Sequence, residues 1–193
     1  MLVALYMGNQ PITSAHTARS HYHLQEVAYL AINKGIVASI AGAAAVSIAL
    51  FTASYEGERN KVYVDPVGHY AVCAGRDSYG PDGKPLKLGQ AFTGDQCSVM
   101  LGKDVKTAGQ ALDRLVSVPL SPGERLAYTD FIFNLGAGAF EASTLRRKLN
   151  SGDRPGACAE LLRWDKGKVK GKLVTLPGLA ARRKAEYQHC TNK

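Results

Sequence analysis

The sequence predicts an α+β fold in which a small β-hairpin region precedes a larger α-helical lobe, with a cleft between the two parts. Between residues 61 and 90, short β-favouring runs alternate with turn residues. From residue 93 onwards, capping signals and apolar stripes typical of helices take over. A long uncharged run before residue 56 predicts a further, separate helix on the N-terminal side of this domain.

The β region begins with the runs KVYV (residues 61–64) and HYAV (residues 69–72), which are rich in β-favouring residues. They are joined by DPVG, in which Asp65, Pro66 and Gly68 occupy the positions that suit a type I turn. The two runs therefore predict a β-hairpin. The turn-rich segment PDGKPLKLG extends the strand-like region to about residue 90.

Two helix starts in the lobe carry specific capping signals. TGDQ (residues 93–96) has the form of a capping box, and so has SPGE (residues 121–124), in which Pro122 stands at the first helical position. Three further helices are predicted around STLRRKLN, PGACAELLRW and LAARRKAEYQHC (residues 143–150, 155–164 and 179–190).

The chain has 193 residues and a formal net charge of +8, which favours a polyanionic partner: nucleic acid, an anionic membrane face or an acidic wall polymer. The sequence contains neither an RNP-like aromatic motif nor zinc-finger spacing. Its basic clusters fall within predicted amphipathic helices. We therefore expect no nucleic acid as partner.

Between Lys34 and Glu56 lie 21 uncharged residues, enough for a helix of about 30 Å, the thickness of a bilayer's hydrocarbon core. Only seven of them are Ile, Val, Leu or Phe, so insertion should be marginal. The run fits a retained anchor, a cleaved signal peptide, or a signal-anchor that later leaves the membrane; a buried core helix is the alternative. Arg19 and Lys34 precede the run, which predicts that the C-terminal domain faces outward.

These features divide the chain into three parts. We expect residues 1–34 to form a loosely structured arm, because they show no clear hydrophobic period. Residues 35–54 form the predicted membrane segment, and residues 55–193 the folded domain.

Glu56 and Asp65 are the candidate catalytic pair. Glycoside hydrolysis needs one protonated carboxylic acid and one carboxylate, and the apolar segment before Glu56 favours its protonated form, whereas a turn keeps Asp65 ionised. The residues fit equally well an ordinary solvated glutamate and a turn-forming aspartate. Their spacing alone leaves both interpretations open.

The motif E-G-x-R-x-x-x-Y-x-D-x-x-G in residues 56–68 resembles the active-site opening of the phage-type lysozymes, glycoside hydrolase family 24. Three later stretches resemble the helical lobe of that family: FIFNLGAGAFEASTLRRKLN (131–150), RW (163–164) and LPGLAARRKAE (176–186). The resemblance covers about residues 55–190. With its Gly/Ala-rich N-terminal segment, the chain is similar to the signal-anchor-release endolysins of phages that infect Gram-negative bacteria.

The resemblance implies a lysozyme-like fold and hydrolysis of the β-1,4 bond from N-acetylmuramic acid to N-acetylglucosamine in peptidoglycan. It implies that Glu56 is the general acid, that Asp65 is the second catalytic carboxylate, and that Phe133, Asn134 and Ser143 lie along the substrate. We expect a monomer without metal or cofactor, held first at the host inner membrane and then released to the periplasm. A lytic transglycosylase and a non-catalytic, wall-binding or membrane-anchored protein are the alternatives.

One position departs from the family pattern. Ala71 stands where these lysozymes have a catalytic threonine, six residues after the aspartate, so no hydroxyl is present there to position the attacking water. His69 and Tyr70 are the neighbouring groups that could hold the water instead. The replacement also keeps the transglycosylase alternative open.

The four cysteines lie far apart, without a C-x-x-C pair, and their even number fits two disulfides in an oxidising compartment or four buried thiols elsewhere. Export to the periplasm favours disulfides. We then expect Cys73 to pair with Cys97, linking the hairpin to the first helix, and Cys158 to pair with Cys190, fastening the C-terminal helix.

Overall fold

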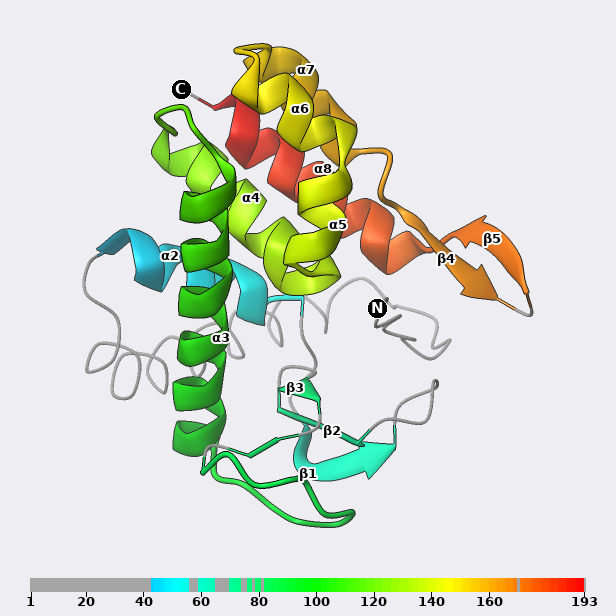
Figure 1. Cartoon of the computed structure of the whole chain (residues 1–193). Helices are drawn as coiled ribbons and strands as arrows, with labels where there is room; N and C mark the ends of the chain where they lie inside the picture. The colour runs from blue at the N-terminus through cyan, green and yellow to red at the C-terminus, as the bar shows by residue number, and fades with distance from the viewer. Residues whose placement is uncertain are drawn as a thin grey trace, which may run out of the picture. The chain divides into compact units, whose positions relative to one another are not determined.

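The computed structural model describes residues 43–55, 59–64, 70–73, 76–77, 79–80, 82–169 and 171–192 (Figure 1). The described residues divide into two compact units, with the division between Lys103 and Asp104. Each unit has a hydrophobic core of its own.

The unit before the division begins with helix α2 (Ala43–Ala53), which covers part of the predicted membrane segment. Residues 35–42 of that segment, like the arm of residues 1–34, lie outside the described residues. In the part of the chain that the structure describes, no helix is both long enough and apolar enough to cross a bilayer. The side chains of Ile48, Ala49 and Thr52 are buried.

Strands β1 (Arg59–Val64), β2 (Tyr70–Cys73) and β3 (Arg76–Asp77) form an antiparallel sheet in that order. Tyr63 pairs with Ala71 and Val64 with Tyr70, which confirms that the two predicted runs pair as a hairpin. The connecting residues 65–69 lie outside the described part. The strand-like region reaches about residue 90, as predicted, but after β3 it consists of isolated bridges, one between Tyr79 and Pro85 and one between Ala91 and Lys61 of β1.

Apolar side chains from the sheet, from the following loop and from the start of the next helix form the core of this unit. The disulfide between Cys73 and Cys97 is confirmed, with the two Cα atoms 5.3 Å apart. It joins the end of β2 to helix α3 (Gly94–Leu115), as the sequence predicted. The core comprises Val62, Val72, Cys73, Leu86, Phe92, Cys97 and Met100.

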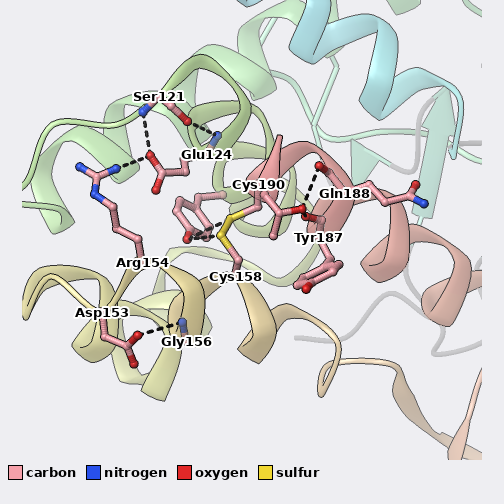
Figure 2. The surroundings of a disulfide bond; sticks show 11 residues. Ser121, Glu124, Asp153, Arg154, Gly156, Cys158, Tyr187, Gln188 and Cys190 are labelled. Carbon is pink, nitrogen blue, oxygen red and sulfur yellow. Dashed lines mark hydrogen bonds and ion pairs between the residues drawn. A yellow bond between two sulfur atoms is a disulfide. The ribbon is translucent and has the colours of Figure 1, made fainter. Parts of the chain in front are cut away.

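Both predicted capping boxes are confirmed. At the start of α3, the Gln96 amide donates to Thr93 Oγ1 at 3.2 Å, and the Thr93 amide donates to Gln96 Oε1 at 2.8 Å. At the start of α4 (Pro122–Leu135), Ser121 and Glu124 exchange the same two hydrogen bonds (Figure 2). Each box supplies partners for amides that the helix itself leaves unpaired.

The unit after the division is the helical lobe. Its helix α4 is buried along most of its length and packs against α8 (Pro177–Thr191). Phe131 of α4 lies at the centre, with Trp164 edge-on at 5.2 Å and Phe140 at 6.0 Å between ring centroids. The shorter helices of this lobe are α5 (Ala137–Ala142), α6 (Thr144–Asn150) and α7 (Arg154–Leu161).

The second disulfide, between Cys158 of α7 and Cys190 of α8, is also confirmed, with Cα atoms 5.7 Å apart (Figure 2). Near it, Arg154 pairs with the buried Glu124 and donates to the carbonyl of Pro119, so α7 is fastened to the start of α4 as well. These links hold the C-terminal helix within the lobe.

Two strands that the sequence did not predict, β4 (Lys166–Val169) and β5 (Lys172–Thr175), form an antiparallel hairpin before α8. Gly171 in the connection has a φ of 79°, the left-handed conformation that glycine adopts readily. The fold is therefore α+β with small antiparallel sheets and a helical lobe, as predicted. The cleft expected between its two parts stays a prediction.

Candidate active site

The two candidate catalytic carboxylates, Glu56 and Asp65, lie outside the described residues. Their neighbours in the chain are described. Tyr55 ends the turn that closes α2, and its ring lies 5.2 Å from that of Phe51. Val64, which pairs with Tyr70, is the last residue of β1 before Asp65. The catalytic roles of both carboxylates stay predictions.

Ala71 lies in β2 and is buried, with 2% of its surface exposed. Its neighbour Tyr70 is 42% exposed. Successive side chains of a strand point to opposite faces of the sheet, so the Tyr70 phenol does not point where a hydroxyl at position 71 would. Of the two groups proposed to hold the water, only His69 remains, and it lies outside the described residues.

Phe133 and Asn134 lie in the last turn of α4, and both are half-buried. The helix ends at Gly136, which has a φ of 88° and donates its amide hydrogen to the carbonyl of Ile132 at 2.8 Å. The positive φ at this glycine, which glycine adopts readily, lets the chain turn tightly after Asn134.

Ser143 is placed differently from the other two candidates. It lies between α5 and α6 and is 4% exposed. Its hydroxyl donates to the carbonyl of Phe140 at 2.6 Å and accepts from the amide of Arg146 at 3.0 Å. These bonds make Ser143 the N-cap of α6, and its contact with substrate stays a prediction.

A buried ion pair joins α4 to α8. Arg182, 2% exposed, donates from Nε and Nη2 to the two carboxylate oxygens of Asp130, both at 2.8 Å. Asp130 has no exposed surface. This two-pronged geometry fixes both side chains in one orientation, and the Arg182 guanidinium also lies 5.9 Å from the centre of the Phe133 ring.

A second buried arginine reaches Asn134 directly. Arg183 donates from Nη2 to Asn134 Oδ1 at 2.8 Å and lies 2.9 Å from Glu186 Oε1. Its guanidinium is 5.2 Å from the centre of the Phe131 ring. The amide of Asn134 is thus held through its oxygen, which leaves its nitrogen as the hydrogen-bond donor.

Burial raises the pKa of Glu186 well above its ordinary value, although the neighbouring Arg183 favours the charged form. Asp130 adds to the increase because a second carboxylate lies close. Sequence reasoning missed this cluster. The spacing of Arg183 and Glu186 signals a helical ion pair, but charged residues are rarely fully buried, and nothing in the sequence indicated that these are.

No group of three His, Cys, Asp or Glu side chains within the described ranges could hold a metal ion. The expectation that the protein needs no metal or cofactor stays a prediction.

A protein-family model described as phage lysozyme matches residues 53–186. The chain belongs to the phage lysozyme family. A protein named SAR-endolysin from bacteriophage PS119 is 36% identical over 166 residues, which are 83% of this chain and 94% of that protein. An endolysin of Acyrthosiphon pisum secondary endosymbiont phage 1 is 39% identical over 132 residues, 68% of this chain and 86% of that protein.

Comparison with solved structures supports the same family assignment. The endolysin of Escherichia coli O157:H7 phage FAHEc1 superposes with a TM-score of 0.68 at 30% identity, covering 75% of this chain and 90% of that one. The muramidase domain of SpmX from Asticaccaulis excentricus also reaches 0.68, but at 24% identity, and so supports the fold alone. This phage lysozyme is a lysozyme-type glycoside hydrolase that degrades peptidoglycan in phage lysis, as the sequence predicted.

Proposed function

We propose that this phage lysozyme cleaves the β-1,4 bond from N-acetylmuramic acid to N-acetylglucosamine, with Glu56 as general acid and Asp65 as the second carboxylate. The observation that carries the assignment is the family match, which begins at residue 53 and so includes the whole motif of residues 56–68. Glu56 protonates the leaving oxygen, and Asp65 stabilises the oxocarbenium-like transition state or activates water.

Asn134 and Phe133 bind the sugar in this proposal. Because Arg183 occupies the amide oxygen of Asn134, its NH₂ group is available to donate to an acceptor on the glycan, such as an acetyl carbonyl. Phe133 offers a half-buried ring beside it. Ser143 supports them indirectly by capping α6.

Ala71 determines how the water is held. Position 71 carries no hydroxyl, and Tyr70 points to the other face of β2, so orientation of the water falls to Asp65 itself or to His69. The absence of a hydroxyl at position 71 also favours the second candidate function, a lytic transglycosylase, which forms an anhydro sugar and needs no attacking water.

Mass spectrometry of the muropeptides released from purified sacculi tests the assignment. We expect reducing muramic ends from the wild-type protein, none from Glu56→Gln, and unchanged release from the matched control Glu141→Gln, whose side chain is exposed. Anhydro ends would establish the transglycosylase. No release from a folded, disulfide-bonded protein would favour a wall-binding role.

We also propose that residues 35–54 first hold the enzyme at the host inner membrane, with residues 55–193 in the periplasm, and then leave the bilayer. The relative from bacteriophage PS119 is named a SAR-endolysin, and both disulfides suit the periplasm. The burial of Ile48, Ala49 and Thr52 within the protein fits a released segment. Delayed release would keep the enzyme from lysing the host before phage assembly is complete.

A further inference from the structure

Among the described residues, no further strand pairs with the β4–β5 hairpin. Its strands pair with each other from Lys166 and Thr175 to Val169 and Lys172, and they form a sheet of two strands only. It extends away from the helices of its lobe (Figure 1). Apart from Gly167, every residue described in these strands is exposed. An isolated two-stranded hairpin is only marginally stable. Packing in a core therefore does not explain which side chains this hairpin carries.

The charge on the hairpin is of one sign. The stretch KGKVKGKLVT, residues 166–175, contains four lysines and no acidic residue. Within the described part of the chain, no ion pair involves Lys166, Lys168 or Lys172. Their charges are therefore not neutralised by an ion pair with any acidic residue that the structure describes.

Apolar side chains lie among these lysines. Leu173 is 66% exposed, and Val169 and Val174 are each 39% exposed. Leu173 lies opposite Lys168, whereas Val169 and Val174 are diagonal neighbours on the other face, with only Gly167 opposite Val174. Val169 and Leu173 lie in the two residue pairs nearest the turn. When the turn approaches an apolar phase, both side chains can therefore enter it while the long lysine side chains keep their ammonium groups at its surface.

We propose that the β4–β5 hairpin docks this lysozyme on a phospholipid bilayer that carries anionic headgroups. Lysines alone would suit any polyanion, including the carboxylates of the cell wall. The three exposed aliphatic side chains do not suit a hydrated polymer, because they stay in water there. At a bilayer, by contrast, the attraction of lysines to headgroups and the burial of apolar area add together. This surface is independent of the roles assigned to Glu56 and Asp65.

Vesicle binding of the full chain tests the proposal, with phosphatidylcholine alone and with phosphatidylcholine containing phosphatidylglycerol. The uncharged segment of residues 35–54 is common to all variants, so the ratio of the two affinities isolates the charge-dependent part. Each lysine should contribute about five-fold (~1 kcal/mol) near an anionic surface. The triple variant Lys166→Gln, Lys168→Gln, Lys172→Gln should therefore reduce the ratio by about a hundred-fold, and added salt should weaken wild-type binding.

Matched controls carry the same changes elsewhere. Lys87→Gln, Lys106→Gln and Lys184→Gln together remove the same charge from other exposed positions and should leave the ratio within a few-fold of wild type. Leu173→Ser should weaken binding to anionic vesicles by about ten-fold, whereas Leu88→Ser, at a residue that is 62% exposed, should not.

An unchanged ratio in the hairpin triple variant would overturn the proposal, and so would equal losses in the control triple variant. If the hairpin triple variant kept its lipid preference but hydrolysed purified sacculi more slowly, the surface would belong to the wall substrate instead. Hydrolysis of sacculi at the wild-type rate, together with loss of the lipid preference, is the result we expect.

Discussion

Removing the Cys158–Cys190 disulfide should lower the free energy of unfolding by about 3.7 kcal/mol at 25 °C. The bond closes a loop with a sequence separation of 32. For a loop of that length, the lost entropy of the cross-linked unfolded chain corresponds to about 3.7 kcal/mol. The Tyr128 hydroxyl lies 3.2 Å from Cys190 Sγ and 3.6 Å from Cys158 Sγ, so substitution also removes a buried polar contact. The two effects have the same sign.

Urea unfolding of the oxidised protein measures the effect, with Cys158→Ala, Cys190→Ala and the double variant compared. Because either single substitution already breaks the bond, each should lower the free energy of unfolding nearly as much as the double variant. In thermal unfolding, Tm should fall by about 10 °C. Cys73→Ala with Cys97→Ala is the matched comparison, for which a separation of 24 predicts about 3.4 kcal/mol. Additive single costs, or a double-variant loss below about 1 kcal/mol, would refute the reasoning.

Three further predictions concern other parts of the chain. Replacing Gly42 and several alanines within residues 38–49 by leucine should retain the enzyme in the membrane fraction and abolish lysis of the host, because leucine strengthens insertion; soluble, lytic protein from this variant would contradict release. Glu186 has a raised pKa in the folded protein, so its contribution to stability is present below its ordinary value of 4.5 and is lost as the pH rises towards the folded value. In urea titrations, Glu186→Gln should therefore gain stability relative to wild type as the pH rises from about 4.5 to neutrality, and a constant difference would argue against a protonated Glu186. A Cβ at Gly123 would clash with a backbone carbonyl of α8, whereas a Cβ at Gly109 meets no atom within 4 Å, so thermal unfolding should show Gly123→Ala destabilised by about 1–3 kcal/mol and Gly109→Ala unchanged or stabilised; equal Tm values would refute this packing.

The sequence predicted best the features that depend on a few adjacent residues. The capping boxes at Thr93 and Ser121 were predictable because each hydrogen bond joins residues three positions apart. The hairpin of β1 and β2 was predictable for a similar reason, since its pairing depends on one short connection. The family motifs then extended these local predictions to the whole domain.

The β4–β5 hairpin and helix α5 were missed because their local patterns are ambiguous. β4 and β5 are exposed on both faces, so their sequence lacks the alternation of apolar and polar residues that indicates a half-buried strand. The lysine and glycine between them were the available signal for a two-residue connection. Helix α5 has only six residues, too few to show a helical period.

The buried charges could not be predicted because their partners are distant in sequence. The hydrogen bonds from Arg182 to Asp130 span 52 positions, and the bond from Arg183 to Asn134 spans 49. In the sequence, Arg182 and Arg183 form part of a basic cluster on a helix, for which solvent exposure is the ordinary expectation. In the folded lobe, α8 packs against α4, and both arginines are buried.

The geometry of this cluster indicates what it does for the enzyme. A buried ion pair is weak evidence for stability, since apolar side chains of similar volume often stabilise a protein equally well or better. Apolar substitutes could not, however, orient an amide. The fork between Arg182 and Asp130 fixes α8 against α4, and the next residue, Arg183, then holds the oxygen of Asn134. On the proposal that Asn134 binds the glycan, these buried charges hold its nitrogen in one orientation towards that substrate.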